Sequence, residues 1–107
     1  MGFLNQVKTL LPRYAVCLTD IDTAAKTVDC SGFILAVGSR ISVKFTNGNS
    51  AANPTLNVNS TGDKNIFYQD KKIADSTAII RTGGVYDFVY DGINYEITGN
   101  VENGYGY

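Results

Sequence analysis

The sequence contains no histidine and no tryptophan, and only two cysteines and two prolines among its 107 residues. Histidine is the usual general base near neutral pH and a common zinc ligand. Its absence excludes the Ser-His-Asp and Cys-His arrangements of nucleophilic catalysis and argues against a zinc site. Gly83-Gly84 also lacks the lysine and serine of a phosphate-binding loop. We therefore expect neither enzymatic activity nor a cofactor.

The chain also lacks a charged face and a long apolar run. Nine basic and ten acidic residues give a net charge of -1, whereas nucleic-acid binding needs a basic face. Acidic residues flank the one basic doublet, Lys71-Lys72. No segment approaches the roughly 20 apolar residues that cross a bilayer, and the N-terminus lacks the pattern of a secretory signal. We expect neither a nucleic-acid partner nor membrane insertion.

Two pairs of carboxylates are the remaining candidates for chemistry. Asp20 and Asp22 have the spacing of a calcium loop, but further oxygen ligands do not follow at a useful distance. Asp87 and Glu96 are expected to face each other across a hairpin, and a glycosidase would need them in a cleft with unequal environments. The sequence shows no sign of such a cleft. Turn-forming aspartates are the preferred interpretation of the first pair, and solvated carboxylates on the exposed face are that of the second.

The two cysteines, Cys17 and Cys30, leave two alternatives open. Both can be buried as small apolar thiols, which pack well in cores. If they lie on adjacent strands, they can instead form a disulfide. Buried thiols are the preferred interpretation.

Residues 1–12 differ from the rest of the chain and predict a short amphipathic helix. Apolar residues recur there at spacings of three and four, and Pro12 ends the pattern. A helix this short is marginal alone, so it must pack on its own domain or on a partner. We interpret it as an anchor, with these candidate residues: Phe3, Leu4, Val7, Leu10 and Leu11.

From residue 13 to residue 99 the apolar pattern has the period of β-strands. The clearest segment is 40–45, where three apolar residues share one face. Tyr14, Val16 and Leu18 also share one face of an expected strand. The further expected strands are 14–19, 26–30, 33–37, 55–59, 65–69 and 77–80. About eight short strands with frequent turns predict an all-β domain, an antiparallel β-sandwich or jelly-roll.

The last expected hairpin pairs residues 85–90 with 93–98 around Asp91-Gly92, a preferred type I′ turn. A two-residue loop sets Tyr90 opposite Ile93. This register gathers the apolar residues on one face. They are Tyr86, Phe88, Tyr90, Ile93, Tyr95 and Ile97.

Seven tyrosines are present, and tyrosine suits recognition surfaces because it combines rigid contact area with a polar tip. The tyrosines of the last hairpin are expected in the core. Residues 100–107 are expected to form a flexible tail. Tyr68, together with Tyr105 and Tyr107 in this tail, is therefore a candidate for surface recognition.

Several segments resemble a module of bacteriophage virions that recurs in tail fibres, baseplate proteins and head fibres. They are TAAKTV at 23–28, CSGF at 30–33, ISVKFTN at 41–47, ANPTLNVNSTG at 52–62, VYDFVY at 85–90 and INYE at 93–96. The resemblance spans residues 13–99. It implies a small β-domain on the virion exterior, often in trimers, whose partners are other virion proteins.

The resemblance implies adhesion or decoration and no reaction. The expected function is a structural virion protein, namely a head fibre, a capsid decoration protein or a tail-fibre component at the virion surface. The alternative is a carbohydrate-binding module for a host cell-surface glycan, because polar Asn, Gly and Ser loops offer adaptable hydrogen-bonding groups. We carry over no binding residues, since no motif determines them.

Overall fold

The structure is a computed structural model that describes residues 13–69, 71–72 and 79–98. No helix occurs among these residues, and the all-β prediction is confirmed. The predicted anchor at 1–12 and the predicted tail at 100–107 lie outside them. The strands are β1 (Tyr14–Cys17), β2 (Ala25–Val28), β3 (Arg40–Phe45), β4 (Thr55–Val58), β5 (Lys64–Tyr68), β6 (Lys71–Lys72), β7 (Gly84–Tyr90) and β8 (Tyr95–Ile97).

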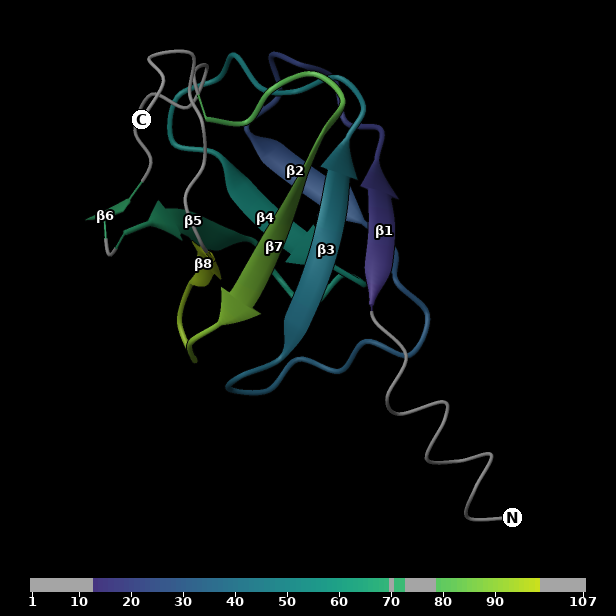
Figure 1. Cartoon of the computed structure of the whole chain (residues 1–107), viewed down its shortest axis with the longest axis vertical. Coiled ribbons are helices and arrows are strands. Elements are labelled where there is room, and N and C mark those ends of the chain that lie inside the picture. The colour runs from purple at the N-terminus through teal and green to yellow at the C-terminus, as the bar shows by residue number, and fades with distance from the viewer. Residues whose placement is uncertain (1–12, 70, 73–78, 99–107) are drawn as a thin grey trace.

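The strands form one sheet that curls until it nearly closes on itself (Figure 1). The order is β1-β3-β7-β8-β5-β4-β2, and β6 pairs with β5. The pairs β1–β3, β2–β4 and β5–β8 are parallel. The domain is therefore a barrel-like mixed sheet, where we predicted an antiparallel sandwich. Alternation within one strand does not report which distant strand lies beside it or in which direction it runs.

β1 and β2 are the two ends of the strand order, and side chains close the seam between them. The Thr27 N–H donates to Thr19 Oγ1 at 3.1 Å, and Cys30 Sγ donates to the Tyr14 carbonyl at 3.7 Å. A groove of about 430 Å³ runs along this seam. Its lining residues are Val16, Leu18, Thr19, Thr27, Val28 and Asp29.

The core follows the predicted alternation in the central strands. Ile41, Val43 and Phe45 of β3 are buried, and so are Leu56 and Val58 of β4. Full burial of such side chains contributes about 1.5–3 kcal/mol each. The predicted inward faces are therefore confirmed. Each of these strands has a single apolar side, and a register shift of one residue would expose that side to solvent.

Aromatic rings pack against one another across the neighbouring strands β3, β7 and β8. The ring of Phe88 lies 6.0 Å from that of Phe45 and 6.3 Å from that of Tyr95, both edge-on. Tyr90 also contacts Tyr95, with ring centroids 5.4 Å apart. Such pairs contribute about 0.5–1.5 kcal/mol beyond their buried area. The hairpin tyrosines lie toward the core, as expected.

β1 turns its larger apolar residues outward. Tyr14, Val16 and Leu18 share one face as predicted, but that face is exposed to 53, 45 and 70%. The core side of β1 consists of Ala15 and Cys17, which are both buried. Small side chains suit this position, because the curled sheet brings β1 close to β2.

The last hairpin has a longer loop than predicted. Tyr90 pairs with Tyr95, which leaves residues 91–94 as the loop. Asp91 Oδ1 accepts hydrogen bonds from the N–H groups of Ile93 at 2.9 Å and Asn94 at 2.7 Å. A register shift of two residues keeps every side chain on its predicted face. The exception is Ile93, which leaves the hairpin face and is 74% exposed.

Residues 33–37, which we predicted as a strand, form a loop. Ser39 Oγ donates to the Ile34 carbonyl at 2.6 Å and accepts from the Ala36 N–H at 3.1 Å. These local bonds occupy backbone groups that a ladder would otherwise use. Of the predicted strand 77–80, only residues 79 and 80 are described, and they lie in a turn and a bend.

Candidate functional site

One end of the barrel carries three highly exposed apolar side chains. Ile34, Val37 and Ile93 are exposed to 77, 77 and 74%. Ile34 and Val37 lie in the loop before β3, and Ile93 lies in the loop after β7. β3 and β7 are antiparallel, so both loops meet at one end of the sheet (Figure 1). We call Ile34, Val37 and Ile93 the apolar end.

Hydrogen bonds hold the two loops of the apolar end together. The Gly38 N–H donates to the Tyr90 carbonyl at 2.7 Å, and the Tyr90 N–H donates to the Ser39 carbonyl at 2.9 Å. A Cβ at Gly92 would lie 3.2 Å from Val37 Cγ2, and its φ of +106° also favours glycine. The apolar side chains are therefore presented from an ordered base.

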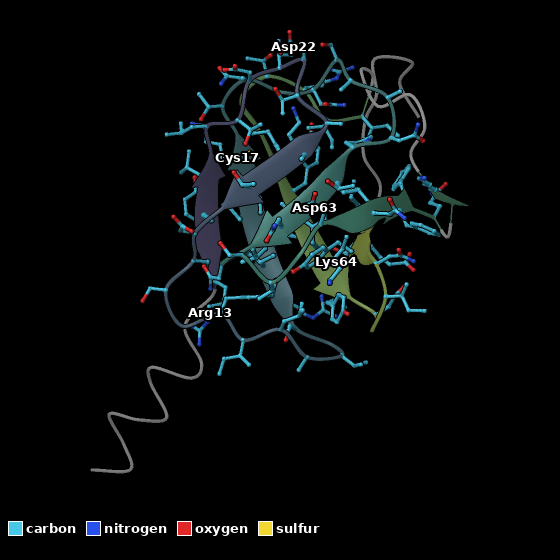
Figure 2. All side chains as sticks on the ribbon, turned by 180° about the vertical axis from the view of Figure 1, so that it is seen from behind. Arg13, Cys17, Asp22, Asp63 and Lys64 are labelled. Atoms are coloured by element: carbon cyan, nitrogen blue, oxygen red, sulfur yellow. The ribbon has the colours of Figure 1, made fainter. Side chains whose placement is uncertain are left out.

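The chain enters the barrel at this same end. Arg13 directly precedes β1, and β1 runs parallel to β3. A Cβ at Gly32 would lie 3.5 Å from Arg13 Cζ, so the arginine packs against the loop that carries Ile34. Figure 2 shows Arg13 and Asp22 at opposite ends of the barrel. The candidate anchor residues lie outside the described part, but the sequence joins them to this end through Pro12.

The opposite end, which we call the polar end, consists of loops 18–24, 46–54 and 81–83. The Asn47 side chain donates to the carbonyls of Leu18 and Thr19 at 3.1 and 3.2 Å. The Ser50 N–H donates to the Ile21 carbonyl at 2.7 Å. Polar side chains thus hold these loops to one another. The name refers to these hydrogen-bonding side chains, since Leu18 and Ile21 are also exposed in loop 18–24, to 70 and 46%.

A fully buried lysine lies beneath the polar end. Lys26 is 0% exposed, and its Nζ donates to the Asp20 carbonyl at 2.9 Å and to the Ile21 carbonyl at 3.4 Å. Burial lowers the pKa of Lys26, while Cys17, Asp22 and Asp20 act in the opposite direction. The ammonium group ties the turn between β1 and β2 to the core.

Our sequence analysis did not single out Lys26. The signal was present, because the period of two places Lys26 on the same inward face as Val28 and Cys30. Lysine is almost never fully buried without partners, which is why an inward lysine reads as an exception to the pattern. Its carbonyl partners come from a turn that the pattern does not place.

Tyr68 does not lie on the surface, and the prediction that it is exposed is wrong. It is only 7% exposed, because the alternation of β5 turns Ile66 and Tyr68 inward and leaves Phe67 half-buried. The other two candidates, Tyr105 and Tyr107, lie outside the described residues.

Cys17 and Cys30 are both buried and carry free thiols. They are 1 and 4% exposed. Cys30 contributes its thiol to the seam, while Cys17 lies on the core side of β1 near Lys26. Of the two alternatives left open by the sequence, the structure contains the buried thiols.

The carboxylates Asp87 and Glu96 do not face each other, so that expectation is wrong. The longer hairpin loop pairs Glu96 with Val89, and Asp87 pairs with Ser42 on β3. Ser42 Oγ donates to Asp87 Oδ1 at 2.5 Å. The two-residue register shift therefore separates the only cross-strand carboxylate pair that we considered.

Metal ligands and membrane spans were sought only within residues 13–69, 71–72 and 79–98. That part of the chain contains no group of three or more His, Cys, Asp or Glu residues that could hold a metal ion. In the same residues, no helix is long and apolar enough to cross a membrane.

The apolar end, the polar end and the buried Lys26 are thus chemically distinct features of the described residues. No family model, no curated protein and no solved structure matches the chain.

Proposed function

We propose that this protein is a non-enzymatic structural subunit of a bacteriophage virion, which displays its β-domain at the particle surface. The observation that carries the proposal is the apolar end. Highly exposed apolar side chains that gather at one place mark an interaction site. In this proposal the apolar end faces other virion proteins and the polar end faces outward.

The size of the apolar end indicates that it does not act alone. Burying an exposed Ile or Val contributes about 1.5–3 kcal/mol, so the three side chains supply several kcal/mol. Association costs at least about 4 kcal/mol in lost freedom of motion. Additional apolar area is therefore needed, and the candidate anchor residues at 3–11 supply it from a segment that joins this end.

The resemblance to virion modules extends the proposal to oligomers, often trimers. A rotation axis close to the apolar end would bring the equivalent patches of several copies together, as closed symmetry requires. Head fibre, capsid decoration protein and tail-fibre component are all forms of this role.

The test is incorporation into the particle. We expect a phage that encodes a deletion of residues 2–11 to yield particles without this protein, measured by mass spectrometry of purified virions. Circular dichroism of the isolated variant serves as the control for folding. Normal incorporation of the truncated protein would refute the anchor.

A second candidate function is a carbohydrate-binding module for a host cell-surface glycan. The observation that favours it is the exposed ring of Tyr14 beside Ser42 and Asp87 on the outer face of the sheet. An aromatic ring and a carboxylate are groups that bind the apolar face and the hydroxyls of a sugar. A glycan array separates the two functions, because a purely structural subunit binds no glycan.

A further inference from the structure

Ser42 lies at the centre of a cross formed by four larger side chains on the outer face of the sheet. Tyr14 on β1 and Asp87 on β7 are its cross-strand partners. Arg40 and Lys44 are the neighbouring outward residues of β3. Such neighbours lie about 5 Å away across strands and about 7 Å away along a strand. Ser42 therefore forms the floor of a depression, which we call the Ser42 depression.

A cleft of about 260 Å³ opens at this position. It lies on the face formed by β1, β3 and β7, which is turned toward the viewer in Figure 1. Ligand pockets for larger molecules start at about 300 Å³, so this cleft has the size for one sugar ring. Its lining residues are Arg13, Arg40, Ile41, Ser42, Asp87 and Phe88, so the cleft extends from Ser42 toward Arg13 and Arg40, whereas Tyr14 and Lys44 border Ser42 outside this lining.

Positive charge predominates around the Ser42 depression. Arg40 and Lys44 are exposed, and neither forms an ion pair within the part of the chain that the structure describes. Asp87 is the one carboxylate that borders it, and this carboxylate accepts a hydrogen bond from the Ser42 hydroxyl. Glu96 lies farther away, beyond Val89, in the row of Arg40. The cleft lining itself contains two cationic side chains, Arg13 and Arg40, and one carboxylate, and this balance favours an anionic ligand.

Tyr14 adds an apolar wall to one side of the depression. Its side chain is 53% exposed although it lies on a strand. A tyrosine ring offers rigid, amphipathic contact area at a low cost in conformational entropy. It can cover the C–H face of a pyranose ring that rests over Ser42.

We propose that the Ser42 depression binds a hexuronic acid residue of a polysaccharide. The sugar ring packs against Tyr14, and Asp87 accepts hydrogen bonds from its hydroxyls. Arg40, which lines the cleft, binds its carboxylate, for which the guanidinium fork is well suited. This inference rests on the second candidate function and names its ligand class.

Each group around the depression selects against another ligand. A neutral sugar would offer Arg40 no counter-charge. A phosphate dianion above Ser42 would meet the Asp87 carboxylate and would have no C–H face for Tyr14. A carboxylated sugar suits Tyr14, Asp87 and Arg40 together, because it combines an apolar face, several hydroxyls and one negative charge.

The test is titration of the full chain with trigalacturonate, followed by amide chemical shifts at low ionic strength. We expect the amides of β1, β3 and β7 around Ser42 to shift and the affinity to fall as salt is added. Arg40→Gln should weaken binding by about tenfold or more, because it removes a charge-assisted contact. Ser42→Leu should abolish binding by filling the floor. Arg81→Gln makes the same charge change at the polar end and should bind like the wild type.

Each outcome is decisive. Equal affinity for a neutral trigalactose would overturn the selection for acid while leaving the carbohydrate-binding function intact. If neither oligosaccharide binds and a glycan array shows no binding, both the selection for acid and the carbohydrate-binding function are refuted. Wild-type affinity in a folded Arg40→Gln variant, or full competition by inorganic phosphate, would overturn the Ser42 depression as the site.

Discussion

Lys26 is the residue whose surroundings differ most from those expected for its type. Its ammonium group is fully buried and binds two backbone carbonyls of the turn between β1 and β2. Burial of a charge is costly, and this cost lowers the pKa of Lys26 below 10.5. The carbonyls of Asp20 and Ile21 also accept bonds from Thr23 and Ser50, so they keep partners without the lysine.

We expect Lys26→Met to remain folded. Its free energy of unfolding should depend less on pH than that of the wild type. Between the lowered pKa of Lys26 and 10.5, the unfolded wild type binds more protons than the folded form. The free energy of unfolding of the wild type therefore gains a contribution that rises with pH across that window. Urea titrations at a series of alkaline pH values measure this slope.

The slope should be smaller in Lys26→Met, and an apolar side chain of similar length often replaces a buried charge at little cost in stability. Lys44→Met removes an exposed lysine and should retain the wild-type slope. An unchanged slope in Lys26→Met would contradict this account of the buried ammonium.

Tyr95 is a second residue with an uncommon environment. Its hydroxyl is buried and has no hydrogen-bond partner in the described part of the chain. The nearby Thr61 hydroxyl donates instead to the Val58 carbonyl at 2.7 Å. Burial raises the pKa of Tyr95 from 10.0 to about 12. The neutral ring is thus strongly preferred in the folded state.

We expect Tyr95→Phe to be more stable than the wild type by about 1 kcal/mol, because it removes a buried group without a partner. From pH 10 to about 12 the unfolded tyrosine loses its proton before the folded one does. The raised pKa of Tyr95 therefore contributes to the free energy of unfolding of the wild type. This contribution is fully present below pH 10 and is lost as the pH rises through about 12. Between pH 10 and about 12, the melting temperature of Tyr95→Phe should fall less than that of the wild type. The melting temperature of Tyr14→Phe, a change at an exposed tyrosine, should fall as much as that of the wild type.

The loop between β7 and β8 shows how one side chain sets the register of an element. Asp91 Oδ1 accepts two backbone N–H groups of the loop, and these bonds lower the pKa of Asp91. Its contribution to stability is present above pH 3.8 and is lost as the pH falls through the lowered pKa. These bonds lie directly beside the pairing of Tyr90 with Tyr95, which closes the four-residue loop.

We expect Asp91→Ala to destabilise the protein by about 1 kcal/mol, the usual value for a lost hydrogen bond. Asp91→Asn retains an acceptor oxygen, so it should keep most of the stability but lose the acid dependence. Guanidinium unfolding at neutral and at acid pH measures both effects. Equal stability of Asp91→Ala and the wild type would mean that the loop does not need the carboxylate.

At the scale of the whole molecule, the barrel separates an apolar end from a polar end. Alternation determines which residues of a strand point inward, but loops collect at an end only because of the way the strands are connected. Ile34 and Val37 are distant in sequence from Ile93, and they meet because β3 and β7 pair. The barrel wall between the two ends remains available for other contacts.

In the proposed oligomer, we expect Val37→Asp combined with Ile93→Asp to weaken self-association. Each wild-type side chain contributes about 1.5–3 kcal/mol when covered, so the dissociation constant should rise by well over about tenfold. Analytical ultracentrifugation measures the shift. Both side chains are more than 70% exposed, so the fold should tolerate the change. Val85→Asp, on the barrel wall, should associate like the wild type; the opposite order of effects would place the interface elsewhere.

The candidate site was less predictable than the strands. Ile93 was assigned to the core because a two-residue turn places it there, and Tyr68 was assigned to the surface although β5 turns it inward. Ser42 and Asp87 were both on outward positions in the pattern, but their contact requires β3 beside β7. Residues of a site come from separate strands, and no local pattern reports which strands are neighbours.

The amino-acid sequence by itself determined that the domain is all-β and which face of β3, β4 and β7 enters the core. It did so because side-chain direction alternates along a strand whatever that strand's neighbours are. Only the tertiary structure decided the parallel pairs, the outward face of β1 and the position of Lys26 under its carbonyls. Those features follow from the pairing of strands that are distant in sequence and from the curvature that nearly closes the sheet. The free energy of such pairing is a sum over contacts along the whole chain, which no local pattern reports.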